Sequence, residues 1–305
     1  MPKIIKIQQH ELVDLYIIKK LSSYQIAKAL SCSQSLIIKK LKLYEIPTRT
    51  IQEGKALTKP IYERRDFSGN LCEKAYMIGF RLGDLYVRKT HPKSPTLQIR
   101  TNSTRPEQLI LFKRIFSKYA EIRTSRPDRR GAILMRCYLN STFSFLWPKQ
   151  DDVEPWIKKG VEYFLAFLAG YTDAEGMFCI RGGDGVFSIR SQDRNILNFL
   201  RLELKKLGVL SQPLSLARPK GSKDKQGVRS NKDVWAFTVY RKQSLLKLVS
   251  LLKPLLKHPK RMKDMYKIER NIIERNQKYN NKADAYWYKT YSHHERALEM
   301  ASNSS

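Results

Sequence analysis

The sequence is poor in cysteine and has no long apolar run, and each shortage excludes a class of protein. Its four cysteines lie far apart and form no CxxC pair, which excludes a disulfide framework and a cysteine-based zinc site. No run reaches the ~18 apolar residues of a membrane-spanning helix, and residues 1–10 lack the apolar core of a signal peptide. These absences predict a protein of the reducing cytoplasm.

Acidic residues are also scarce relative to basic ones. Lys and Arg number 58 against 28 Asp and Glu, so the 305-residue chain has a formal net charge of +30. The hydrophobic share of 42% is enough for packed cores, which excludes a disordered polycation. A charge of this size and sign makes nucleic acid the first partner to consider. Histones and ribosomal proteins are basic too, so charge alone names no activity.

Residues 1–50 have the pattern of a small helical module. Ser22 and Ser23 are good N-caps for a helix over 24–30, and a short turn separates it from a helix over 34–44. Two short helices joined by a tight turn resemble a helix-turn-helix, although Ser31 stands where a turn glycine is usual. A three-helix bundle without a DNA role is the alternative. The side chains of the last helix that we expect to contact DNA are Gln34, Ser35 and Lys39.

A polar stretch at 51–70 predicts a linker, and the chain then repeats one pattern. Residues 71–159 and residues 160–278 each have the periodicity of helix, two strands, helix, two strands and helix, and one strand of the second half is expected over 209–217. The predicted fold class is therefore α+β: a pseudo-twofold pair of α-β-β-α-β-β-α halves with antiparallel sheets, preceded by the small all-α module. A polar tail over 279–305 is expected to be partly disordered.

The first helix of each half carries small residues spaced four apart. Gly79 and Gly83 in the first half match Gly170 and Ala174 in the second. Residues four apart share one helix face, and small ones let two backbones approach closely. A glycine inside a helix costs ~1 kcal/mol relative to alanine. The glycines therefore need a packing reason, which we predict to be contact between the two helices.

An acid ends each of these helices. Asp84 follows Gly83, and Glu175 follows Ala174. Helices packed side by side would bring both carboxylates to one end of the pair, where they repel each other unless a cation lies between them. Mg²⁺ suits such a place, because it binds a few carboxylates together with phosphate oxygens and waters.

The segments Met77–Leu85 and Leu168–Gly176 resemble the paired LAGLIDADG motifs of homing endonucleases in their single-chain form. The second segment is close to the motif, whereas the first has Leu82 at an acidic position. The resemblance covers roughly residues 71–276. It implies a monomeric, site-specific endonuclease of a mobile genetic element. Such an enzyme hydrolyses one phosphodiester on each strand of a long double-stranded DNA target.

The resemblance also implies roles for individual residues. Asp84 and Glu175 would be catalytic and would hold Mg²⁺ or Mn²⁺, and a basic residue near each metal would assist. Lys149 and Lys260 are the matched candidates, since each follows a proline after the last apolar cluster of its half. Lys257 is the runner-up in the second half. The alternative is that these are ordinary surface lysines.

Alternating strands predict a polar face for each sheet, which the family uses as a saddle on DNA. Arg and Gln suit guanine and adenine edges, although a phosphate contact or a solvated face is possible for any one of them. The basic loop after Arg218 is expected to be a mobile arm that contacts phosphate, with a passive loop as the alternative. The candidates are Gln98, Arg100, Arg123, Arg136, Arg181, Ser188, Arg190, Arg218, Lys220, Lys223 and Arg241.

Two rival functions use the same fold. One is a DNA-binding transcriptional regulator that does not cut, and the other is an intron maturase with intron RNA as a partner. The acids Asp84 and Glu175 argue against the regulator, because a protein that does not cut has no need of both.

Overall fold

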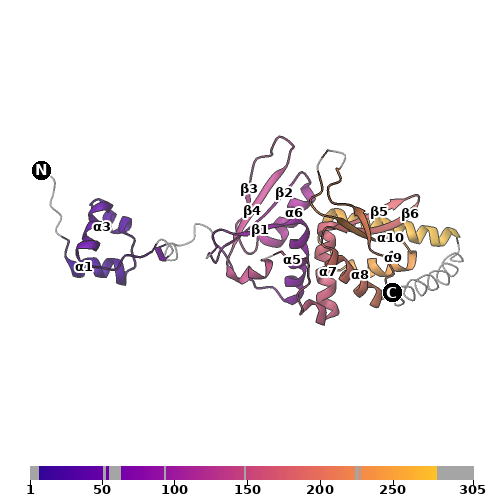
Figure 1. Cartoon of the computed structure of the whole chain (residues 1–305), viewed down its shortest axis with the longest axis horizontal. Helices are drawn as coiled ribbons and strands as arrows, with labels where there is room; N and C mark the ends of the chain where they lie inside the picture. Colours follow the sequence, from indigo (N-terminus) through magenta and orange to yellow (C-terminus); the bar gives the residue numbers. More distant parts are fainter. Residues whose placement is uncertain are drawn as a thin grey trace. The chain divides into compact units, whose positions relative to one another are not determined.

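The computed structural model describes residues 7–50, 53–54, 63–92, 94–147, 149–223, 227 and 229–279 (Figure 1). The chain divides into two compact units, residues 1–61 and residues 62–305. In the described residues, no helix has the length and apolar character that crossing a membrane requires. The expected tail from residue 280 onward lies outside the described residues, as does half of the expected linker, residues 51–52 and 55–62.

The first unit is helical, as predicted. Helix α1 (Gln9–Val13) continues into a π-helical turn, Asp14–Ile18, and is followed by α2 (Ser23–Ala29) and α3 (Gln34–Leu43). The Ser22 hydroxyl accepts a hydrogen bond from the Gln25 backbone, and the Gln25 side chain accepts one from the Ser22 backbone, which makes a capping box. Ser31 has a φ of +49°, the conformation that a turn glycine would supply.

The second unit contains two halves of matching topology. Each has a four-stranded antiparallel sheet, with strand orders β1-β2-β4-β3 and β5-β6-β8-β7. The first half consists of α5 (Leu71–Asp84), β1 (Tyr86–Lys89), β2 (Leu97–Ser103), α6 (Pro106–Phe116), β3 (Arg123–Thr124), β4 (Ile133–Leu139) and a 3-10 helix, Ser141–Leu146. The second half consists of α7 (Val161–Glu175), β5 (Gly176–Arg181), β6 (Asp184–Ser191), α8 (Arg194–Lys206), β7 (Ser215–Arg218), β8 (Val234–Val239), α9 (Lys242–Leu252) and α10 (Pro259–Tyr279). The predicted α+β repeat is confirmed.

Three local features differ from the prediction. The first half closes with a 3-10 helix in place of an α-helix, and β7 begins only at Ser215 although a strand was expected from Val209. The second unit also begins before residue 71. Arg64 forms a β-bridge with Ala120, and the Phe67 ring packs edge-on against Phe143 at 5.6 Å. The last residues of the expected linker therefore belong to the packed core of the first half.

Helices α5 and α7 pack against each other in the centre of this unit (Figure 1). A Cβ added at Gly79 would lie 2.2 Å from the carbonyl oxygen of Phe167, and one added at Gly170 would lie 2.0 Å from that of Tyr76. Real Cβ atoms do not approach so closely, so the two backbones touch where the glycines lie. This is the packing reason that the sequence pattern requires.

Candidate functional site

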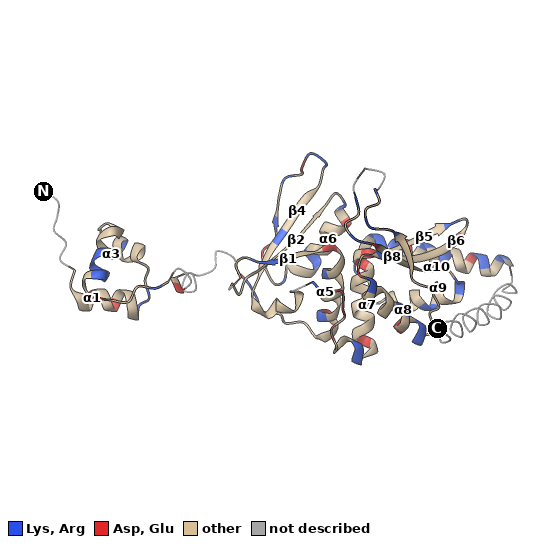
Figure 2. Cartoon of the chain, in the orientation of Figure 1, with Lys and Arg blue, Asp and Glu red and all other residues tan. Residues whose placement is uncertain are grey.

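Asp84 and Glu175 meet at one end of the central helix pair. Each is the last residue of its helix, α5 or α7, and the glycine contacts hold the two helices together. A Cβ added at Gly83 would lie 2.4 Å from the Ala174 Cβ and 2.8 Å from the Glu175 Cγ. The small residue at position 83 therefore makes room for the Glu175 side chain beside Asp84. Figure 2 shows acidic residues at these helix ends.

Burial raises the pKa of both acids, and the charge of Asp84 adds to the rise at Glu175. Burial raises the pKa of Asp84 to about 6, although Arg261 and a 2.9 Å hydrogen bond from Gln108 Nε2 favour its charged form. Burial also raises the pKa of Glu175 to about 7, and the charge of Asp84 adds to that rise. A half-buried carboxyl group whose pKa is raised by a neighbouring carboxylate helps to form a site that attracts a cation.

A third acid, Asp173, has a structural role beside this pair. It is fully buried, and its Oδ2 accepts hydrogen bonds from the Tyr76 hydroxyl at 2.6 Å and from the Lys257 backbone at 2.7 Å. Burial raises its pKa to about 6. Asp173 thus connects α5 and α7 to the chain that leads into α10. The first half has the apolar Leu82 at the matching position.

The structure brings Lys149 and Arg261 to the acids. The Lys149 ammonium donates to the carbonyl oxygen of Leu82, and its charge lowers the pKa of Glu175. The Arg261 guanidinium donates to the carbonyl oxygen of Ala174 at 3.3 Å, and its charge lowers the pKa of both acids.

Lys260, the expected partner of Lys149, lies differently. Its ammonium pairs with Asp264 on the next turn of α10. The basic side chain of the second half that lies beside the acids is therefore Arg261, one residue further along. The runner-up Lys257 lies 4.0 Å from the centre of the Tyr76 ring, and burial lowers its pKa.

Sequence reasoning missed three residues of this region. Gln108 on α6 donates to Asp84, and Arg261 lies beside both acids. Asp193 accepts hydrogen bonds from Tyr171 and lies 3.6 Å from the Lys149 ammonium. Gln108 was hidden because it lies within an apolar helix pattern. Arg261 could have been found by extending the search for a basic residue one position past Lys260.

The outer face of the first sheet carries polar and basic side chains, as predicted. In the strand register, Arg100 on β2 lies opposite Arg136 on β4, and Arg136 lies opposite Arg123 on β3. The three arginines therefore lie in one row across the sheet. Gln98 is on the same face but is only 4% exposed, because it accepts from Arg88 and donates to Tyr138. Gln98 therefore supports its neighbours and is not itself presented to solvent, contrary to the expectation of direct contact.

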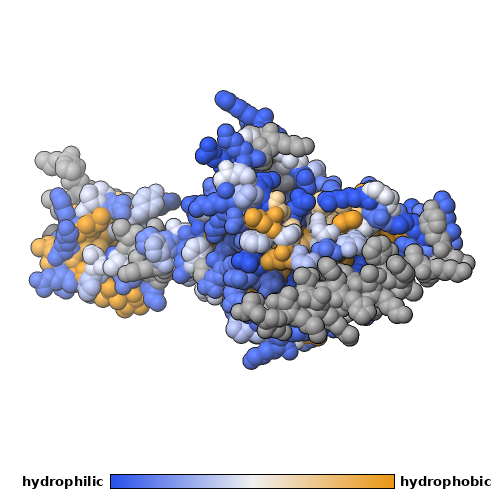
Figure 3. All heavy atoms as spheres, turned by 45° about the vertical axis from the view of Figure 1, so that its right-hand side comes forward, coloured by the Kyte–Doolittle hydropathy of each residue, from blue (hydrophilic) through white to orange (hydrophobic). Residues whose placement is uncertain are grey.

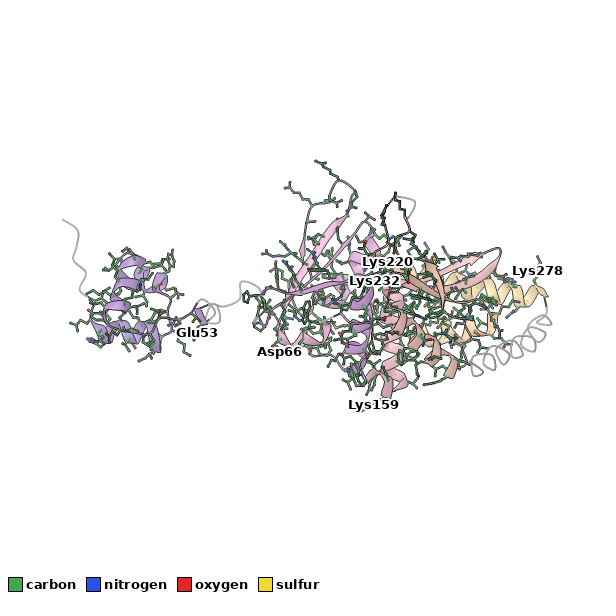
Figure 4. All side chains as sticks on the ribbon, in the orientation of Figure 1. Glu53, Asp66, Lys159, Lys220, Lys232 and Lys278 are labelled. Carbon is green, nitrogen blue, oxygen red and sulfur yellow. The ribbon has the colours of Figure 1, made fainter. Side chains whose placement is uncertain are left out.

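The second sheet is less basic on its outer face. Arg190 is exposed, Arg181 is exposed opposite Asp184, and Ser188 is buried. The exposed Arg218 ends β7, and Arg241, which has a partner, precedes α9. Lys220 and Lys223 lie in the basic loop between β7 and β8, where Figure 4 labels Lys220 and Lys232. Lysines and arginines are seen in Figure 2 on this loop and on the one between β3 and β4.

In the first unit, the three candidates on α3 differ in their contacts. Gln34 donates to the Ser23 hydroxyl at 3.0 Å, and the hydroxyls of Ser35 and Ser33 are hydrogen-bonded at 3.0 Å. Lys39 is exposed. On the face drawn in Figure 3, the coloured residues are largely hydrophilic, with apolar areas between them.

Comparison with known proteins gives one family match. Residues 162–240 match a family model described as a LAGLIDADG-like domain. This segment starts in α7 and ends just after β8. No curated protein matches the chain.

Several solved structures are similar to part of the chain. The homing endonuclease I-WcaI bound to its DNA recognition sequence is 13% identical, with 74% of this chain and 97% of that chain covered and a TM-score of 0.44. I-DmoI in complex with DNA and Ca is 15% identical, with 65% and 100% covered and a TM-score of 0.43. The LAGLIDADG homing endonuclease I-GzeII in complex with its DNA target is 12% identical, with 70% and 94% covered and a TM-score of 0.41.

Proposed function

Because this chain carries a LAGLIDADG-like domain, we propose that it is a site-specific endonuclease of double-stranded DNA that hydrolyses one phosphodiester on each strand. The observation that supports this most is the pair Asp84 and Glu175. Both are half-buried acids with raised pKa values at the end of two helices whose backbones touch. A fold that holds two repelling carboxyl groups together gains nothing in stability from them, which favours a role in chemistry.

The acid pair fits Mg²⁺ or Mn²⁺. Carboxylate oxygens are hard ligands, and each acid would become fully ionised beside a divalent cation. In the described part of the chain no group of three or more His, Cys, Asp or Glu side chains is placed to hold a metal ion. The remaining ligands would therefore be DNA phosphate oxygens and waters. When bound, the cation would supply an activated water and stabilise the leaving oxygen.

Lys149 and Arg261 would assist from either side of the pair. Each is held by a backbone carbonyl oxygen next to the acids, at Leu82 and Ala174. The buried Nε of Arg261 has no hydrogen-bond partner among the described residues. An unpaired buried N–H beside two acids would find an acceptor in a DNA phosphate. We assign these two side chains to phosphate binding and electrostatic help, and Gln108 to orienting Asp84.

The rest of the chain would bind the DNA. The net charge of +30 attracts a polyanion, and the arginines of the two sheets with the loop after Arg218 offer contacts along a long site. The first unit would add contacts as a helix-turn-helix, with Lys39 as its exposed cation. We expect the protein to act as a monomer, because the chain supplies both acids. A mobile genetic element is the expected genetic context.

The test separates cutting from binding. The protein is incubated with a randomised double-stranded library and Mg²⁺, and the cut ends are sequenced to find the target. Asp84→Asn and Glu175→Gln keep the side-chain shape but remove charge, so we expect each to abolish or strongly slow double-strand cutting while gel-shift affinity stays the same or rises. Glu121→Gln, an exposed acid away from the site, is the control.

Two outcomes would contradict the proposal. Wild-type cutting by the double variant would remove these acids from the chemistry. Sequence-specific binding by the wild type without any cutting in Mg²⁺ or Mn²⁺ would favour the transcriptional regulator.

A further inference from the structure

One row of the first sheet concentrates arginine next to the candidate site. Tyr86 is two residues past Asp84, and it pairs with Arg100 on β2. Arg100 pairs with Arg136 on β4, which pairs with Arg123 on β3. Side chains opposite each other in register share a face. Three arginines from three strands therefore form a row at the end of the sheet nearest the acids, which we call the arginine row.

Contacts within this face orient Arg100 and the residues of the next row outward. The Arg100 guanidinium lies 4.0 Å from the centre of the Tyr86 ring. A guanidinium that stacks by its flat face keeps the N–H groups at its edge available for a further partner. In the next row outward, Arg88 donates to Gln98 at 2.7 Å, and Gln98 donates to the Tyr138 hydroxyl at 2.9 Å. Side chains oriented before binding favour selective contact over general attraction.

The matching row of the second sheet has no charge. Met177 is two residues past Glu175 and pairs with Ser188, which pairs with Thr238. These three residues stand where the first half has Tyr86, Arg100 and Arg136. Met177 and Thr238 are partly exposed, whereas Ser188 between them is buried. In the next row outward, Cys179 pairs with Val186. The two halves thus share a topology but differ completely in these rows.

This difference indicates sequence reading. Phosphates are spaced alike along both arms of a duplex, so residues that serve general affinity would be expected in both rows. Arginine is the side chain best shaped for guanine, since its fork contacts O6 and N7 together. Small and apolar side chains contact the thymine methyl group or tolerate several bases.

We propose that the arginine row specifies guanines in the half-site under the first sheet, while the half-site under the second sheet accepts more substitution and favours thymine. The proposal rests on the DNA-binding part of the proposed function, and it adds which residues set specificity and which base they read. It is independent of whether the acids cut.

The test is a binding selection with the full chain. Randomised duplex DNA is selected in Ca²⁺, sequenced, and scored for base preference in each half of the site. The wild type should select guanines in one half of the target site and show a weaker base preference in the other half. Arg136→Ala should lower the preference for guanine ~5- to 150-fold at the position it reads, as expected for a bidentate contact. The matched control Thr238→Ala should leave that half-site unchanged.

Arg136→Lys separates base reading from phosphate contact. It keeps the charge but not the fork, so it should bind with near-normal overall affinity and lose the guanine preference. Equal preference in both half-sites would overturn the proposal. So would a Lys variant that keeps the guanine preference, or an Ala variant that weakens all sequences alike and reduces the salt dependence by about one charge. Binding with this pattern but no cutting in Mg²⁺ would instead refute only the endonuclease.

Discussion

Removing the charge of Glu175 should stabilise the protein when no divalent cation is present. Its pKa rises from the usual 4.5 to about 7, because the side chain is buried beside Asp84. At 1.36 kcal/mol for each pH unit, ionising this group in the folded state at pH 8 costs about 3 kcal/mol. Glu175→Gln keeps the shape and avoids this cost.

The sign of the pH dependence follows from the same shift. The folded state holds this proton more tightly than the unfolded state, so the stabilisation is fully present below about pH 4.5 and is lost as the pH rises through about 7. The advantage of Glu175→Gln over the wild type should therefore be largest near pH 8 and shrink toward pH 5.

Thermal unfolding followed by tryptophan fluorescence in EDTA measures this effect. Residues 1–61 contain no tryptophan, so the signal reports on the second unit. With ~2–4 °C per kcal/mol for a unit of this size, Glu175→Gln should raise Tm by roughly 6–12 °C at pH 8. The control Glu121→Gln, at an exposed position, should change Tm little.

Adding Mg²⁺ should reverse the order. The wild type should gain stability by binding the ion, and Glu175→Gln should gain less. A variant that melts at or below the wild-type Tm in EDTA at pH 8 would show that Glu175 contributes to the fold through its charge. The account of the acid pair as a site of stored repulsion would then be wrong.

Three further outcomes are expected. Gly79→Ala should destabilise the second unit by at least ~2–3 kcal/mol in chemical denaturation, because its methyl group would collide with the Phe167 carbonyl, 2.2 Å away, and only a separation of the helices would relieve it. Arg261→Met should slow cutting ~10²-fold or more and Lys260→Met much less, measured as single-turnover rates, since Arg261 lies beside the acids whereas the Lys260 ammonium pairs with Asp264. A chain that begins at Tyr62 should keep its fold and its cutting activity but bind less tightly or less selectively in gel-shift assays, and unchanged selectivity would remove the DNA role of the first unit.

The central features could be predicted from the sequence because the helix contact needs residues that helix propensity alone disfavours. Gly79 and Gly170 are unfavourable within helices, so their spacing already indicated a helix contact, and the acids follow directly in the chain. The basic residue of the second half could not be chosen with the same certainty. Lys260 and Arg261 are neighbours on a helix, where successive side chains point about 100° apart, and only the packing of α10 decides which one faces the acids.

The alternating pattern of a strand predicted on which face of the sheet a side chain lies, but not how exposed that side chain is. Alternation placed Gln98 correctly on the outer face of β2, yet Arg88 and Tyr138 cover it. The late start of β7 has a similar cause. Val209 is buried as a strand residue would be, but the chain pairs with β8 as a strand only from Ser215. Residues 209–214 and β7 therefore have similar apolar patterns in the sequence, although only β7 pairs as a strand.

The backbone contact between α5 and α7 also determines where the two halves are free to differ. Where backbones touch, there is no space for a new side chain, so the positions of Gly79 and Gly170 admit almost no change. The outer strand faces have no such restriction, and there the halves differ as much as Arg136 and Thr238 do. The helix pair thus works as a fixed frame with two exchangeable surfaces. Residues on the strands could be replaced to change what each surface recognises without moving the acids that the frame holds.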